Sequence, residues 1–231
     1  MYDIALNYLE QNKLLHMDMI VPIKRNTAQI ILASAEGVCL KDIQSGAYFH
    51  SAANHKTGKT MLENLPQNGL FSFHQSFMLE DFVSKVHHKT MMKNHQAVYF
   101  SKKPFEICSN LSIKPMQMKD FDTLMANYDF DLGREYLIGR INAGEVFGGY
   151  INGDLIGFAG IHEEGSVGLL KVLEQFRSKG YAIALASYVA NHQLSQGITP
   201  FIQISIENKP SQALAKKLGF TISKEHIYWL F

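Results

Sequence analysis

The chain has 231 residues, of which 46% are hydrophobic, and this is enough apolar material for one large globular domain or two small ones. Its 22 Lys and Arg residues against 21 Asp and Glu give a formal net charge of +1. No broad electrostatic field therefore draws it to nucleic acid or to an anionic membrane, and any anion site must be local.

The two cysteines, Cys39 and Cys108, lie far apart and form no CxxC pair. This predicts reduced thiols in an intracellular protein and gives no support to a metal site. The longest apolar run, residues 181–190, is too short to cross a bilayer, and Asp3 and Asp18 interrupt the N-terminal apolar stretches. We therefore expect a cytoplasmic protein without a signal peptide or membrane anchor.

The first half of the chain has the pattern of an α/β unit. Apolar residues at helical spacing predict an amphipathic helix over residues 3–15. β-branched and aromatic residues around the turns Glu36-Gly37 and Ser45-Gly46 predict three short strands over residues 28–52. The elements expected after them are a helix over 60–65, a strand over 70–73, a helix over 78–86 and a strand over 96–100.

The polar segment 101–110 has one proline and no clear period, which predicts a junction between domains 1–104 and 105–231. In the second domain, turn residues at 152–154 and 163–165 between apolar runs predict a three-stranded antiparallel meander over 145–173. The other elements expected there are a strand over 111–115, helices over 120–128, 133–144 and 180–196, a strand over 201–206, a helix from Pro210 to Gly219 and a strand over 221–231.

The loop FRSKGYAIAL, residues 176–185, follows the last strand of the meander and opens an apolar helix. The first amides of a helix have no intrahelical partners, and together with the helix dipole they attract anions. Gly180 allows close approach of a ligand, and Arg177 and Lys179 add charge that pairs with phosphate oxygens. By itself the pattern fits either a phosphate cradle or an ordinary strand-to-helix turn.

Here the sequence resembles the GNAT superfamily of N-acetyltransferases. The family's pyrophosphate loop has the pattern Gln/Arg-x-x-Gly-x-Gly/Ala, matched by Arg177-Ser-Lys-Gly180-Tyr-Ala182. Upstream, VGLLKVL is similar to the central strand of the family, and downstream IENKPSQALAKKLGF is similar to its second cofactor segment. The likeness covers about residues 107–231. More faintly, the N-terminal half resembles the degenerate lobe of glycine N-acyltransferase relatives.

The resemblance implies an α/β (α+β) GNAT fold, a mixed and mostly antiparallel twisted sheet flanked by helices, preceded by a smaller α/β lobe. It implies acetyl-CoA as acyl donor and no metal. A backbone amide near Val172 would stabilise the thioester oxyanion, because preorganised amides favour developing negative charge. The residues implied for cofactor binding are Leu170 and Val172 for pantetheine, Arg177, Ser178, Lys179, Gly180, Tyr181 and Ala182 for phosphate, and Asn208 and Ser211 in the second segment.

These assignments have structural alternatives. Leu170 and Val172 also fit plain core packing. Asn208 before Lys-Pro also fits a helix cap, and Ser211 is open to the same double interpretation.

The chain departs from the family at two catalytic positions. Many members carry a glutamate where this chain has Ser166, and a tyrosine where it has Ala215. We predict Glu164 as the general base, with Glu163 and His162 behind it, although a solvated acidic turn fits Glu164 equally well. Ser211, Tyr228 or a water would replace the missing acid.

Two further patterns are close to known binding motifs without matching them. ANHKTGKT, residues 53–60, is close to a nucleotide P-loop but has Ala53 where the pattern requires glycine. His87, His88 and His95 lie close together, but their spacing matches neither a helical zinc pair nor a finger.

The sequence thus favours an acyl-CoA-dependent N-acyltransferase that transfers acetyl to a primary amine of a small molecule or amino acid in a ternary complex. A non-catalytic acyl-CoA-binding module and an NTP-binding protein using Lys59 and Thr60 are the alternatives. We expect a small-molecule partner, neither nucleic acid nor membrane, and leave a homodimer open. The N-terminal half is predicted to cover the acceptor side and to set amine choice.

Overall fold

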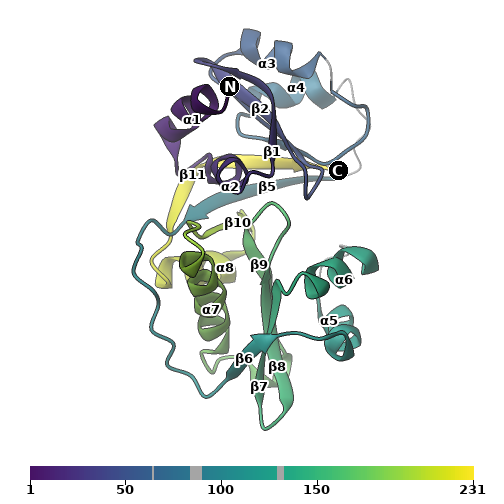
Figure 1. Cartoon of the computed structure of the whole chain (residues 1–231), viewed down its shortest axis with the longest axis vertical. Helices are drawn as coiled ribbons and strands as arrows, with labels where there is room; N and C mark the ends of the chain where they lie inside the picture. Colours follow the sequence, from purple (N-terminus) through teal and green to yellow (C-terminus); the bar gives the residue numbers. More distant parts are fainter. Residues whose placement is uncertain (64, 84–89, 129–132) are drawn as a thin grey trace. The chain divides into compact units, whose positions relative to one another are not determined.

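The computed structural model describes residues 1–63, 65–83, 90–128 and 133–231. The chain divides into two compact units, one of Met1–Val98 with Gln203–Phe231 and the other of Tyr99–Ile202. Figure 1 labels their helices and strands. These units differ from the predicted domains 1–104 and 105–231, because the C-terminal strand pairs with strands of the N-terminal part. As a boundary between two related lobes, that division stays a prediction.

The first unit is built on a seven-stranded sheet with the order β1-β2-β3-β4-β11-β5-β10. Its pairs β1–β2, β2–β3, β4–β11 and β5–β11 are antiparallel, and β3–β4 is parallel. Its strands are β1 (Ala28–Ser34), β2 (Gly37–Asp42), β3 (Tyr48–Ala52), β4 (Phe71–Phe73), β5 (Met91–Val98), β10 (Phe201–Ser205), which crosses the division between the units, and β11 (Thr221–Leu230). Its helices are α1 (Tyr2–Leu9), α2 (Met17–Lys24), α3 (His55–Leu62), α4 (Phe77–Val83) and α8 (Lys209–Lys217).

The position of β11 explains why the C-terminal residues belong to the first unit. Tyr228 pairs with Phe73 of β4 on one side and with Lys93 of β5 on the other. Leu230 is fully buried in a core cluster with Phe71 and other apolar side chains. A fragment starting at residue 105 would therefore leave β11 without either neighbouring strand.

The second unit is built on a four-stranded antiparallel sheet with the order β6-β7-β8-β9. Helices α5 and α6 pack on one face and α7 on the other (Figure 1), each over its own apolar cluster. The elements are β6 (Ser112–Pro115), α5 (Phe121–Asn127), α6 (Arg134–Asn142), β7 (Val146–Ile151), β8 (Asp154–Ile161), β9 (Val167–Val172) and α7 (Tyr181–Ser195). The predicted meander is confirmed as β7, β8 and β9.

Several expectations for the first half were wrong: the helix expected over 3–15 ends at Leu9, and the strand expected over 96–100 is β5, which begins at Met91. Helix α2 was not predicted, because residues Met17 to Ile23 are all buried and a helix buried on every side shows no amphipathic period. The helix expected over 60–65 lies at His55–Leu62, capped by the Asn54 side chain, which accepts from the Thr57 amide at 3.0 Å. The helix expected over 78–86 is α4, and its predicted end lies outside the described residues.

No helix within the described ranges is both long and apolar enough to span a bilayer.

Candidate functional site

Strand β9 forms one edge of the four-stranded sheet. Among the described residues it pairs with β8 alone, from Val167 opposite Ile161 to Val172 opposite Gly157. The side chains of Leu170 and Val172 pack against the apolar cluster under α7. The predicted inward packing of these two side chains is thus confirmed. On its other edge β9 pairs with no strand among the described residues, which is the edge that an extended ligand could join.

A bulge interrupts β9 in its middle. The register shifts between Phe158 and Gly160 of β8, so that Leu169 and Leu170 together oppose Ala159. Leu169 has a φ of 52°, which is a costly conformation for a leucine. A bulge of this kind turns backbone groups away from the regular ladder, and it gives β9 an irregular backbone beside its free edge.

The loop after β9 is shaped by two left-handed residues. A short 3-10 turn at Glu174–Phe176 ends at Arg177, Ser178 has a φ of 62°, and Gly180 has a φ of 81° as the N-cap of α7. Glycine takes this conformation without the steric penalty that a side chain adds. A Cβ built at Gly180 would meet nothing within 4 Å, so the helix start faces open space.

The opening amides of α7 are left for an outside acceptor. The Gly180 carbonyl accepts from the amides of Ile183 and Ala184 at 3.0 and 3.2 Å. Across the described part of the chain, the amides of Gly180, Tyr181 and Ala182 have no hydrogen-bond acceptor, and no side chain caps the helix. Unpartnered amides at the positive end of a long helix form an anion-binding arrangement.

The two basic residues of the loop are exposed. Arg177 Nε donates to the Val172 carbonyl at 3.4 Å, and Lys179 Nζ lies 5.9 Å from the centre of the Phe176 ring. Both side chains thus stay beside the start of α7, and no carboxylate of the described residues forms an ion pair with either. Their charge adds to the anion preference of the amides.

A polar cluster lies where β8 turns into β9. Ser166 is buried and its hydroxyl donates to the half-buried Glu164 carboxylate. The Tyr136 hydroxyl from α6 and His162 Nδ1 are 2.6 Å apart. His162 also packs against β9, because a Cβ added at Gly168 would lie only 2.3 Å from His162 Nε2. Tyr136, which the sequence did not single out, therefore contacts His162, one of the predicted base candidates.

Burial governs the titration of both rings. It lowers the pKa of His162, an effect that the Glu164 charge opposes and the Arg140 charge reinforces. Burial likewise raises the pKa of Tyr136, with the Glu164 charge adding to it. His162 is therefore neutral near pH 7 and can accept a proton.

The other predicted site residues belong to the first unit. The Asn208 side chain caps α8 by accepting from the Ser211 amide at 3.0 Å, so the capping interpretation of Asn208 is confirmed, and the cofactor role of both residues stays a prediction. Tyr228 lies in β11, with Lys93 Nζ 5.8 Å from its ring centre. Ala215 is buried. The structure thus brings Glu164, β9 and the loop into one unit and places Asn208, Ser211 and Tyr228 in the other.

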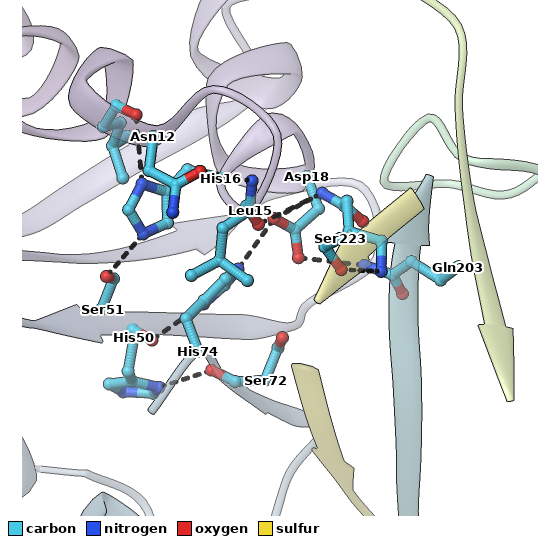
Figure 2. Close-up of polar contacts among 12 residues, drawn as sticks. Asn12, Leu15, His16, Asp18, His50, Ser51, Ser72, His74, Gln203 and Ser223 are labelled. Carbon is cyan, nitrogen blue, oxygen red and sulfur yellow. Dashed lines mark hydrogen bonds and ion pairs between the residues drawn. The ribbon is translucent and has the colours of Figure 1, made fainter. Parts of the chain in front are cut away.

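A second polar cluster, in the first unit, escaped sequence reasoning. The fully buried Asp18 carboxylate accepts from His74 Nε2 at 2.8 Å and from Gln203 Nε2 at 2.9 Å (Figure 2), and also from Gln96 Nε2 at 3.2 Å. His74 Nδ1 lies 2.9 Å from the His50 carbonyl. Burial opposes the charged form of His74, but the facing Asp18 raises its pKa. These contacts join α2, β5, β10 and the residue that follows β4.

The P-loop-like pattern does not form a phosphate loop. Lys59 and Thr60 lie inside helix α3 rather than in a loop, and Gly58 packs against Phe77 and Met78. The P-loop interpretation is therefore wrong, since its phosphate cradle needs loop amides ahead of the helix. His87 and His88 lie outside the described residues. Within the described ranges, no three His, Cys, Asp or Glu side chains are grouped to hold a metal ion.

Comparison with known proteins places the fold. Residues 152–230 match a family described as FR47-like protein, and no curated protein matches the chain. A Drosophila protein of known structure aligns with a TM-score of 0.64 at 14% identity, over 84% of this chain and 74% of the other.

Two bacterial structures align over almost their whole length. An acetyltransferase from the GNAT family of Colwellia psychrerythraea has a TM-score of 0.55 at 14% identity, covering 98% of this chain and 97% of that one. A GCN5-related N-acetyltransferase-like protein from Streptococcus suis has the same TM-score and identity, covering 99% and 100%.

The chain therefore has the GNAT fold, so its resemblance to the GNAT superfamily is confirmed at the level of the fold, as is the predicted α/β class. The likeness of the N-terminal half to glycine N-acyltransferase relatives stays a prediction.

Proposed function

We propose that the protein is an acyl-CoA-dependent N-acyltransferase that transfers acetyl from acetyl-CoA to a primary amine of a small molecule or amino acid. One observation carries the proposal: β9 is an edge strand of the described sheet, and the loop after it leads to the amides of Gly180, Tyr181 and Ala182, which have no acceptor among the described residues. An extended arm that ends in a diphosphate matches these two features, and coenzyme A has that form. No metal takes part in this scheme.

The pantetheine arm would pair with β9 as an added strand, which needs only backbone groups on an open edge. The diphosphate would occupy the start of α7, where Ser178 to Ala182 supply backbone and Arg177 and Lys179 supply charge. The thioester carbonyl would then lie along β9, where an amide near Val172 can stabilise the oxyanion.

In the reaction, the amine nitrogen attacks the thioester carbonyl carbon and forms the C–N bond, while negative charge moves to the carbonyl oxygen. The C=O bond then re-forms and the C–S bond breaks, which releases coenzyme A as its thiolate. The nitrogen loses one proton to a base, for which Glu164 and the neutral His162 are the candidates. The thiolate takes up a proton from Ser211, Tyr228 or water.

The proposal is tested by release of free thiol from acetyl-CoA across a broad amine library. Gly180→Glu places a carboxylate at the phosphate position, and we expect it to weaken coenzyme A binding ~10- to 100-fold, which corresponds to losing one or two charge-assisted hydrogen bonds.

Gly197→Glu is the matched control for Gly180→Glu. Gly197 follows the other end of α7, its φ is 74°, and it also has open space around a built Cβ. We expect this variant to bind coenzyme A like the wild type. Equal loss in both variants, or none in either, would contradict the proposed phosphate position.

A non-catalytic acyl-CoA-binding module is the second candidate. Ser166 stands where many family members carry the glutamate base, and Ala215 where they carry the tyrosine acid. The lack of both catalytic groups favours this candidate. Tight binding of acetyl-CoA without thiol release for any amine would select this candidate over the enzyme. The small-molecule partner, the absence of nucleic acid and membrane partners, a homodimer and a cytoplasmic location remain predictions.

A further inference from the structure

A buried arginine borders the polar cluster at the turn between β8 and β9. Arg140 of α6 is only 7% exposed, and its Nε donates to the Ile161 carbonyl at 2.9 Å. Over the described part of the chain, its two Nη atoms have neither a hydrogen-bond acceptor nor a carboxylate partner. Neither Nη atom is among the buried polar atoms that lack a partner in the described structure, so both reach solvent and their donors are open to a ligand acceptor.

The charges around Arg140 suggest what the acceptor is. Tyr136 and His162 both feel the positive charge of Arg140 and the negative charge of Glu164, and Tyr136 feels Glu163 as well. Tyr136 and Arg140 are four residues apart on α6 and therefore share a face. Arg140 thus supplies one positive charge, and Glu163 and Glu164 supply two negative charges. These charges surround the hydrogen-bonded rings of Tyr136 and His162.

We propose that Arg140 binds a carboxylate of the acyl acceptor, so that the acceptor class is an amine that also carries a carboxylate. With Nε fixed on the Ile161 carbonyl, the two Nη atoms remain for an end-on, bidentate contact, which matches the geometry of a carboxylate. The ammonium end of such a zwitterion is attracted by Glu163 and Glu164 and can lose its proton to His162 or Glu164. This inference rests on the proposed acyltransferase function.

A structural role is the rival explanation. Glu145 Oε2 is buried without a partner in the described structure. The Glu145 amide donates to the Arg140 carbonyl at 3.0 Å, and its carbonyl accepts from the Ile161 amide at 2.9 Å. If Arg140 served only to neutralise Glu145, its loss would affect every acceptor alike.

Pairs of amines that differ only by the carboxylate separate these two roles of Arg140, for example glycine with methylamine and phenylalanine with phenethylamine. Arg140→Gln should lower kcat/KM for the carboxylated member ~10- to 100-fold through KM, as expected for losing hydrogen bonds between charged groups. It should change kcat/KM for the other member less than about three-fold. A wild-type preference for the amine without a carboxylate, or an equal loss for both members, would overturn the proposal.

Arg134→Gln is the matched control on the same helix. Arg134 is exposed and its guanidinium lies 4.5 Å from the centre of the Phe121 ring, outside the cluster. We expect this variant to keep the wild-type ratio within each pair. If Arg140→Gln fails to fold, Arg140→Lys, which keeps the charge and loses the fork, should raise KM for the carboxylated member alone.

Binding without turnover keeps the inference separate from the proposed function. Ligand-observed NMR should detect phenylalanine but not phenethylamine on the wild-type protein, and Arg140→Gln should abolish the phenylalanine signal. Thiol release with carboxylate-free amines only would uphold the acyltransferase and defeat the carboxylate site. Phenylalanine binding without any thiol release would uphold the carboxylate site and defeat the acyltransferase. If phenylalanine does not bind, the carboxylate site is wrong whatever the thiol assay shows.

Discussion

The two polar regions of the molecule treat their hydrogen-bonding groups in opposite ways. In the first unit, the buried Asp18 carboxylate receives three side-chain donors, and both ring nitrogens of His74 are engaged. In the second unit, the amides that open α7 have no acceptor within the described residues and face open space at Gly180. Groups that satisfy one another inside the fold stabilise it, whereas groups left unpartnered at an accessible helix start are available to a ligand.

The largest expected effect is on the first region. Asp18→Ala removes the carboxylate that faces the buried His74 and takes an acceptor from the side-chain amides of Gln96 and Gln203. Breaking a buried pair in this way should cost about 3–5 kcal/mol in the free energy of unfolding, measured by urea denaturation. The control, Asp3→Ala on the exposed first turn of α1, should cost less than about 0.5 kcal/mol. An Asp18→Ala cost below about 1 kcal/mol would show that the network does not hold the unit together.

The next effect concerns catalysis in the second region. His162→Gln removes a proton acceptor and should lower kcat about 100-fold, since general base catalysis is typically worth ~10² to 10⁴. Tyr136→Phe should lower kcat less, because the phenol acts through its hydrogen bond to His162 Nδ1, and it should shift the pH profile of kcat. If Glu164→Gln abolishes turnover while His162→Gln leaves it unchanged, Glu164 alone is the base.

Two buried histidines of the first unit make the stability of the protein depend on pH. Burial lowers the pKa of both His16 and His50 to about 3. In the unfolded chain the same side chains have the ordinary histidine pKa of about 6.5 and take up protons below it. Stability is therefore full above that value and falls as the pH drops toward 3, by about 2 kcal/mol per histidine between pH 7 and 5.

The raised pKa of His74 acts in the opposite direction, because its contribution is present below about 6.5 and is lost as the pH rises through the pKa of the folded state. Urea midpoints measured from pH 8 to 5 check both signs. His50→Gln should flatten the acid side of the curve, and an unchanged slope would contradict the assignment of that side to buried neutral histidines.

The smallest effect is expected from the exposed loop cations. Arg177→Gln and Lys179→Gln should each weaken coenzyme A binding only a few-fold, because exposed charges are screened and the amides carry most of the contact. Calorimetry at low and high salt should show the difference from the wild type shrinking as salt is added. A loss above about 100-fold, unchanged by salt, would move the main phosphate contact from the amides to the side chains.

The sequence alone predicted the elements whose positions depend on neighbouring residues. Turn residues located β7, β8 and β9, and Gly180 located the start of α7, because a left-handed cap needs no information from the rest of the chain. It was not sufficient where the fold joins distant segments. Asp18 and His74 are 56 residues apart, and nothing local to either indicates the pairing.

The site shows the same limit. Glu164 and the loop were found from motif and spacing, whereas Tyr136 and Arg140 were not, because they reach the β8–β9 turn only once α6 packs on the sheet. The sequence assigned Asn208 to a cofactor segment, and in the structure its side chain caps α8 in the first unit. Secondary structure follows from local pattern, but the partner of a buried charge depends on tertiary packing.

Amide NMR of the protein titrated with coenzyme A observes the contrast between the two regions directly. We expect the largest chemical-shift changes at the amides of Gly180, Tyr181 and Ala182 and along β9, while the amides of Asp18 and His74 stay in place. Saturable binding that leaves the three amides at the start of α7 unmoved would contradict the central claim that they hold the diphosphate.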